Sequence, residues 1–284
     1  MKQDCSSLTA HKVAMMRAAH QILDHPKVFD DPIALTIVGT QGVSDIHLKK
    51  RQFSSRLSSC LRAIVVARSR LVEDELAAAI KRGVRQYVVL GAGLDTFSCR
   101  HPYSDKGLSV FEVDYPATQA WKRELLDAAG IPVPDSLTFV SIDFENQTTA
   151  ERLQEAGFKE GEPSFFSWLG GTMYLNRTTV MDTLKYVASV TPSGSAIVFD
   201  YVVPLSSQGF LRRLVFRLLA MRMAMAGEPW QSSFDPHQLT IDLKAVGFTY
   251  VDDMGPEGIN SRFFNNRDDR LMAGGFGHLM NARH

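Results

Sequence analysis

Residues 86–96 read Gln-Tyr-Val-Val-Leu-Gly-Ala-Gly-Leu-Asp-Thr, an apolar run that leads directly into a Gly-x-Gly loop. The run predicts a strand over 86–90 that is buried on both faces, as in a parallel sheet. Gly91 and Gly93 let the backbone turn sharply and let a ligand approach without a Cβ in the way. Because α/β sheets bind ligands at the carboxyl ends of parallel strands, this loop is the first candidate binding site.

The loop departs from the dinucleotide-binding pattern in two respects. That pattern has a third glycine three residues after the second, where this chain has Thr96. Asp95 places a negative charge where it would repel the pyrophosphate of a dinucleotide. A sulfonium that carries an α-amino group would not be repelled, so the loop favours a nucleoside bearing an amino acid over NAD.

Short apolar runs alternate with helical patterns after the loop. Strands are expected at 108–113, 137–142, 164–169 and 195–202, and helices at 117–129, 148–156 and 178–190. Such alternation predicts βαβ units, an α/β fold and a mostly parallel, Rossmann-like sheet. A helix at 236–246 and strands at 248–252 and 276–282 would complete a sheet of six or seven strands.

Helical segments flank this core. Helices are expected at 8–25 and 56–82, with short helices and loops at 26–55, and a helical insertion at 206–226. We expect the insertion to cover the acceptor pocket, with core packing or membrane-surface binding as alternatives. The chain is expected to form one domain, divided into N-terminal helices (1–82), a cofactor-binding core (83–202), the insertion (203–247) and C-terminal strands (248–284).

The composition argues against several classes of protein. Lys and Arg number 31 together, as do Asp and Glu, so the basic excess typical of nucleic-acid binding is absent. Three widely spaced cysteines offer no disulfide framework, and no histidine or cysteine spacing indicates a metal site. The chain shows no secretory signal and no apolar run of transmembrane length, so we expect a cytoplasmic protein with a small-molecule substrate.

Acidic residues end the second and third predicted strands. Asp114 lies 21 residues after Gly93, close to the ~20-residue spacing at which an acid reaches ribose hydroxyls. Glu112 shares its face of the strand and competes for this role, and capping of the next helix is the alternative for Asp114. Asp143, followed by Phe144, ends the third strand, where it can accept a hydrogen bond from an adenine amino group.

Arg68 lies on the apolar stripe of the helix predicted at 56–82, unlike Arg62 and Arg70. A buried guanidinium needs an anionic partner, because an unpaired charge is costly away from water. A ligand carboxylate is one option for Arg68. An internal salt bridge and a side chain that extends to solvent are the others.

The chain resembles the leucine carboxyl methyltransferase and polyketide O-methyltransferase family. The resemblance rests on QYVVLGAGLDTFSCR at 86–100 and FEVDYP at 111–116, with weaker matches at 9–10, 17–18, 31–32, 173–175 (MYL), 198–202 (VFDYV) and 227–230 (GEPW). It implies the class I methyltransferase fold and S-adenosylmethionine as the cofactor. Arg68 would then pair with the methionine carboxylate, and Gly91 and Gly93 would cradle the methionine. Asp114 would bind the ribose, and Asp143 with Phe144 would hold the adenine.

Leu169 and Gly170 stand where many relatives carry Glu-Gly before MYL, which leaves the acceptor chemistry open. A carboxylate acceptor needs no base, whereas a hydroxyl needs one. Tyr174, Tyr201 and His237 are candidates by position, and no catalytic residue is assigned. The expected function is O-methylation of a small-molecule or carboxylate acceptor. The alternatives are a catalytically silent S-adenosylmethionine-binding module and a nicotinamide-dependent oxidoreductase.

Overall fold

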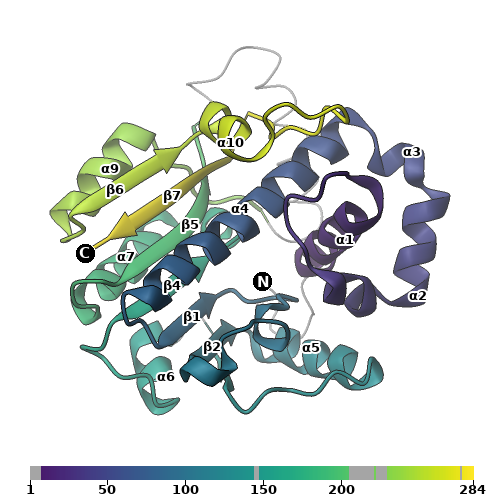
Figure 1. Ribbon diagram of the computed structural model, residues 1–284. Coiled ribbons are helices and arrows are strands. Elements are labelled where there is room, and N and C mark those ends of the chain that lie inside the picture. Colours follow the sequence, from purple (N-terminus) through teal and green to yellow (C-terminus); the bar gives the residue numbers. More distant parts are fainter. Residues whose placement is uncertain (1–7, 144–146, 205–220, 222–228, 276) are drawn as a thin grey trace.

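The computed structural model describes residues 8–143, 147–204, 221, 229–275 and 277–284. In this part of the chain a seven-stranded sheet has the strand order β3-β2-β1-β4-β5-β7-β6 (Figure 1). The strands are β1 (Gln86–Leu90), β2 (Ser109–Asp114), β3 (Leu137–Ser141), β4 (Ser164–Trp168), β5 (Ala196–Val202), β6 (Tyr250–Met254) and β7 (Gly277–Arg283). The first five run parallel, and β7 is antiparallel to β5 and β6. The predicted Rossmann-like α/β fold is therefore confirmed.

Helices cover both faces of this sheet (Figure 1). Before β1 come α1 (Leu8–Leu23), α2 (Pro32–Leu48), α3 (Lys50–Phe53) and α4 (Arg56–Lys81); the later helices are α5 (Pro116–Ala128), α6 (Thr149–Glu155), α7 (Arg177–Val190), α9 (Pro236–Ala245) and α10 (Pro256–Phe263). Side chains of α4 and α10 share one core cluster with β1 and β2. Side chains of α6, α7 and α9 form the cluster on the opposite face. Burial on both faces explains why the parallel strands are nearly continuous apolar runs.

The N-terminal helices form a third, smaller cluster. Apolar side chains of α1 and α2 pack around Leu94 of the loop after β1 and Leu126 of α5. Thr96 joins this region to the start of α2, because its hydroxyl donates a 2.7 Å hydrogen bond to buried Asp31. This packing places α1 directly against the glycine loop.

The short helices expected at 26–55 are present, because non-helical angles at Gly39 divide α2 and the four-residue α3 follows it. The prediction for Arg62 is wrong. Arg62 is buried, because it forms an ion pair with Asp24 in which Nε lies 2.6 Å from Oδ2. The buried stripe of α4 is therefore wider than the sequence pattern indicated. Helix α10 is a further element that the sequence pattern did not predict. The expected insertion at 206–226 lies outside the described residues except for Met221, and the division into regions stays a prediction.

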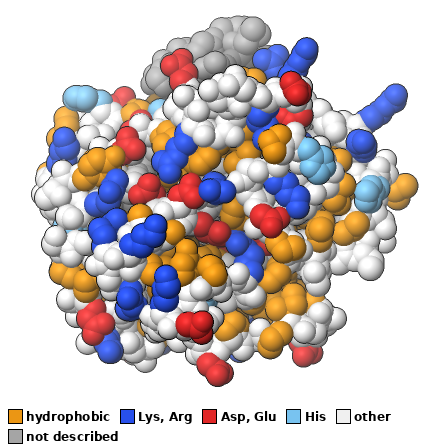
Figure 2. Space-filling model, viewed as in Figure 1, with side chains coloured by type: hydrophobic (Ala, Val, Ile, Leu, Met, Phe, Trp, Pro, Cys, Tyr) orange, Lys and Arg blue, Asp and Glu red, His pale blue; other side chains and the backbone are white. Residues whose placement is uncertain are grey.

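Charged side chains of both signs are interspersed on the face shown in Figure 2. Basic side chains do not gather there into one continuous area, which agrees with the neutral composition. Among the described helices, none combines the length and apolar character that a bilayer span requires.

Candidate functional site

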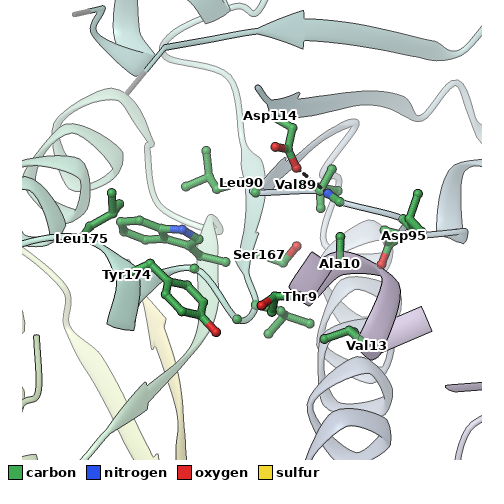
Figure 3. Close-up of a pocket in the computed structure, with 18 of the residues that line it drawn as sticks. Thr9, Ala10, Val13, Val89, Leu90, Asp95, Asp114, Ser167, Tyr174 and Leu175 are labelled. Atoms are coloured by element: carbon green, nitrogen blue, oxygen red, sulfur yellow. Dashed lines mark hydrogen bonds between the residues drawn. The ribbon is translucent and has the colours of Figure 1, made fainter. Parts of the chain in front are cut away.

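A pocket of about 430 Å³ lies at the carboxyl ends of β1, β2 and β4, with α1 along one side (Figure 3). Its volume is within the range of small-molecule sites. Thr9, Ala10 and Val13 of α1 face Tyr174 across the space, with Asp95 on the same side as α1 and Asp114 at the top of the view. The remaining wall includes Arg17, Arg68, Gly91, Gly93, Trp168, Leu169, Gly170, Leu175, Thr179, Pro229 and Gln231. The glycine loop is therefore at a ligand-sized cavity, as the strand-end position predicts.

The glycine loop is held closely between β2 and α1. The amides of Gly91 and Ala92 both donate to Val113 O, at 2.8 and 3.2 Å, which ties the loop to the end of β2. Gly93 has a φ of +52°, and a Cβ there would lie 3.2 Å from the Cβ of Ala10. The close approach of α1 and the left-handed backbone together explain why this position is glycine.

Asp114 presents a buried carboxylate at this loop. Its Oδ2 accepts a 2.5 Å hydrogen bond from Gly93 N, and its Oδ1 accepts a 2.7 Å bond from Tyr115 N. Burial raises the pKa of Asp114 to about 6; the two backbone N–H groups and Lys122 oppose this rise, and Glu112 adds to it. Tyr115, not Asp114, is the N-cap of α5, so the alternative role as a helix cap is wrong.

Glu112, the competitor of Asp114 for the ribose, points elsewhere. It is 1% exposed and lies outside the pocket lining. Its Oε2 lies 2.5 Å from Lys122 Nζ, and its Oε1 accepts a 2.8 Å hydrogen bond from Ser98. Its charge is therefore neutralised within the protein, and Asp114 is the acid of β2 that reaches the pocket.

Arg68 lines the pocket and also forms the internal salt bridge that the sequence left as an alternative. Its Nη1 lies 2.5 Å from Oδ2 of Asp200, a residue of β5. Its Nε is buried and has no hydrogen-bond partner in the described structure. Sequence reasoning missed Asp200, whose only signal was its place within the VFDYV motif.

Arg17 of α1 is a second buried arginine at the pocket; the sequence analysis noted it only as part of the family match at 17–18 and gave it no role in the site. Its Nη1 lies 3.5 Å from Asp95 Oδ2 and its Nε lies 3.4 Å from Asp31 Oδ2. It also donates a hydrogen bond to Leu94 O. Arg17 thus joins α1, α2 and the glycine loop, and Asp95 is held by a cation while still lining the pocket.

The structure does not place Asp143, one of the two residues predicted to hold adenine, at the pocket. Asp143 is half-buried and is not among the residues that line the pocket. Its backbone N–H donates to Gln147 Oε1 at 3.0 Å. Phe144 lies outside the described residues, so the adenine contact stays a prediction.

Of the three candidate bases, only Tyr174 lines the pocket. Tyr201 is fully buried and donates a 2.8 Å hydrogen bond to Asp253, and both burial and that carboxylate raise its pKa. His237 is exposed on α9. Within the described ranges, no cluster of three or more His, Cys, Asp or Glu side chains could hold a metal ion.

The strand order, the glycine loop and the acid that ends β2 define the chain as a Rossmann-like protein with the class I methyltransferase fold. The model of the leucine carboxyl methyltransferase family matches residues 10–188, and the chain belongs to this family. A Bacillus subtilis protein named as an S-adenosyl-L-methionine-dependent methyltransferase, YktD, is 33% identical over 295 residues, which cover 96% of each chain. A Mycobacterium protein (strain JLS) with the same description is 31% identical over 63% of this chain and 69% of its own.

Solved structures support the same fold. A DUF574 family protein from Streptomyces avermitilis has a TM-score of 0.59 and 14% identity, and the match covers 98% of this chain and 97% of that one. A Thermobifida fusca protein named as a methyltransferase has a TM-score of 0.57 and 16% identity, over 95% and 93% of the two chains.

Proposed function

We propose that the chain is an S-adenosylmethionine-dependent methyltransferase that methylates an oxygen atom of a small-molecule acceptor. The observation that carries this proposal is the junction of Gly93 and Asp114, where a buried carboxylate and a glycine loop meet at one pocket. The family and its relatives supply the class of cofactor. We also propose that the protein is cytoplasmic and has no nucleic-acid partner; the equal numbers of basic and acidic residues support the second part.

The described residues fit this cofactor in three respects. Asp114 offers a carboxylate whose remaining lone pairs can accept hydrogen bonds from vicinal ribose hydroxyls. A Cβ at Gly91 would stand in open space, which the glycine leaves free, and Gly93 lets α1 approach the loop. Arg68 has a buried Nε without a protein partner, which suits a methionine carboxylate. The donor therefore lies over β1 and β2, and the acceptor lies on the β4 side of the pocket.

When bound, the cofactor supplies an electrophilic methyl group, so the protein's task is to align the acceptor and exclude water. Helix α1 contributes Thr9, Ala10 and Val13 to one wall of the pocket. A carboxylate acceptor reacts as its anion and needs no base. For a hydroxyl acceptor, Tyr174 lines the acceptor side of the pocket, and its phenolate form would take up the proton that the hydroxyl loses, which leaves a neutral tyrosine.

Methyl transfer can be tested with methyl-labelled S-adenosylmethionine and matched acceptors, namely aliphatic carboxylic acids, phenols and alcohols. We expect label in the organic product; mild base releases it from a methyl ester and leaves it on a methyl ether. A Tyr174→Phe variant should slow transfer to hydroxyls and leave transfer to carboxylates unchanged. If the protein binds S-adenosylhomocysteine but labels no acceptor in the panel or in a small-molecule extract, the silent-module alternative holds. Binding of NAD instead would favour the oxidoreductase.

A further inference from the structure

Asp200 is a buried carboxylate that does not itself line the pocket. It lies near the carboxyl end of β5 and is 4% exposed. Its Oδ1 accepts a 2.6 Å hydrogen bond from Gly170 N, and its backbone oxygen accepts a 2.7 Å bond from the Thr172 hydroxyl. Its Oδ2 lies 2.5 Å from Arg68 Nη1. Contacts from β5, the segment after β4 and α4 therefore fix this carboxylate in one orientation.

Gly170 and Asp200 together hold the Arg68 guanidinium against the pocket wall. Gly170 has a φ of +74°, and a Cβ built there would lie 3.0 Å from Nη2 and 3.1 Å from Nη1 of Arg68. The guanidinium thus lies directly over backbone at Gly170. One of its five N–H groups donates to Asp200, and no other hydrogen bond from this guanidinium occurs in the described structure.

We propose that Asp200 is a positioning residue, which holds Arg68 so that its remaining N–H donors bind the carboxylate of the cofactor's amino-acid part. This inference rests on the proposed function. A free arginine side chain samples many rotamers, and one that is already fixed loses less entropy when the ligand binds. The planar guanidinium can donate to two carboxylates from different edges, so Asp200 and the ligand need not compete for the same N–H groups.

Asp200 has two opposing effects on ligand binding by Arg68, one through its charge and one through orientation, and a substitution can separate them. Its negative charge offsets that of Arg68, so removal of the charge alone would strengthen the attraction between Arg68 and a ligand carboxylate. If orientation is the main contribution, Asp200→Asn weakens binding instead, because one amide oxygen must replace two carboxylate oxygens that accept from Gly170 N and Arg68 Nη1. The direction of the change separates the two effects.

The experiment compares two ligands by calorimetry on the full chain. S-adenosylhomocysteine carries the amino-acid carboxylate, whereas 5′-methylthioadenosine has the same adenosine thioether without it. For Asp200→Asn we expect affinity for S-adenosylhomocysteine to fall tenfold or more and affinity for 5′-methylthioadenosine to change less than twofold. In an Arg68→Gln background, Asp200→Asn should cause no further loss.

The other possible results of the calorimetry distinguish a structural role from a positioning role. Equal losses for both ligands would show a merely structural role, and unchanged or tighter binding of S-adenosylhomocysteine would overturn the positioning role. If Asp200→Asn does not fold, Gly170→Ala provides the second test, because its Cβ displaces the guanidinium while Asp200 is kept. The same selective loss is expected there, and equal losses would overturn the proposal. A wild-type protein that binds neither ligand would contradict the proposed function itself.

Discussion

The pKa of Asp114 gives a direct prediction for cofactor binding. In the free protein burial raises this pKa from 3.8 to about 6. Ribose hydroxyls donate hydrogen bonds to the charged carboxylate, so the ligand binds the deprotonated form preferentially. Because the pKa is raised, the charged form that binds the ligand predominates above pH 6 and is lost as the pH falls below 6.

The pKa of Asp114 also sets how strongly the affinity for the ligand should change with pH. With a pKa near 6, roughly one carboxyl in eleven is charged at pH 5, so affinity at pH 5 should be about tenfold weaker than at pH 7.5, or about 1.4 kcal/mol. At pH 7.5, Asp114→Ala should weaken binding by about 1–3 kcal/mol, since it leaves buried hydroxyls unpaired.

Calorimetry with S-adenosylhomocysteine between pH 5 and 7.5 measures this dependence. Asp114→Asn is the matched control, because it keeps the size of the side chain and removes the titrating proton; its affinity should be weaker and independent of pH in this window. A wild-type affinity that does not change with pH, or a variant that keeps the wild-type slope, would refute the assignment of the ribose to Asp114.

Three further predictions concern the surroundings of the site. Gly93→Ala should abolish measurable cofactor binding, and adding Ala10→Gly should restore part of it by removing the Cβ that lies 3.2 Å from the new methyl group; no recovery in calorimetry would mean that backbone strain alone is responsible. Lys122→Met should lower the free energy of unfolding by about 3–5 kcal/mol, because it leaves buried Glu112 unpaired, and adding Glu112→Gln should recover most of this loss in denaturant titration. Tyr201→Phe should leave the pH profile of methyl transfer unchanged, since the hydroxyl donates to Asp253 outside the pocket; a shifted profile would make Tyr201 part of the reaction.

The sequence predicted those features that depend on local pattern. Strand β1 occurs at the predicted residues, and the loop after it and Asp114 line one pocket. Period-2 alternation placed Glu112 and Asp114 on one face but could not show that Glu112 lies under α5, where Lys122 pairs with it, whereas Asp114 ends the strand at the open edge.

Pairs between distant residues were beyond prediction. Arg68 and Asp200 are 132 residues apart, and Arg62 pairs with Asp24 across 38 residues. A helical pattern shows that a charge lies on an apolar stripe without showing which acid from another element neutralises it. Asp143 lies two residues beyond the end of β3, the edge strand of the sheet, and does not line the pocket. Strand ends at the margin of a twisted sheet diverge from the central ones.

A crystal structure of the complex with S-adenosylhomocysteine would show whether these residues bind the cofactor. We expect the ribose hydroxyls within hydrogen-bond distance of Asp114, the sulfur beside Gly93 and the amino-acid carboxylate against Arg68. A ligand bound in this pocket without contact to Asp114, or bound elsewhere on the protein, would contradict this expectation.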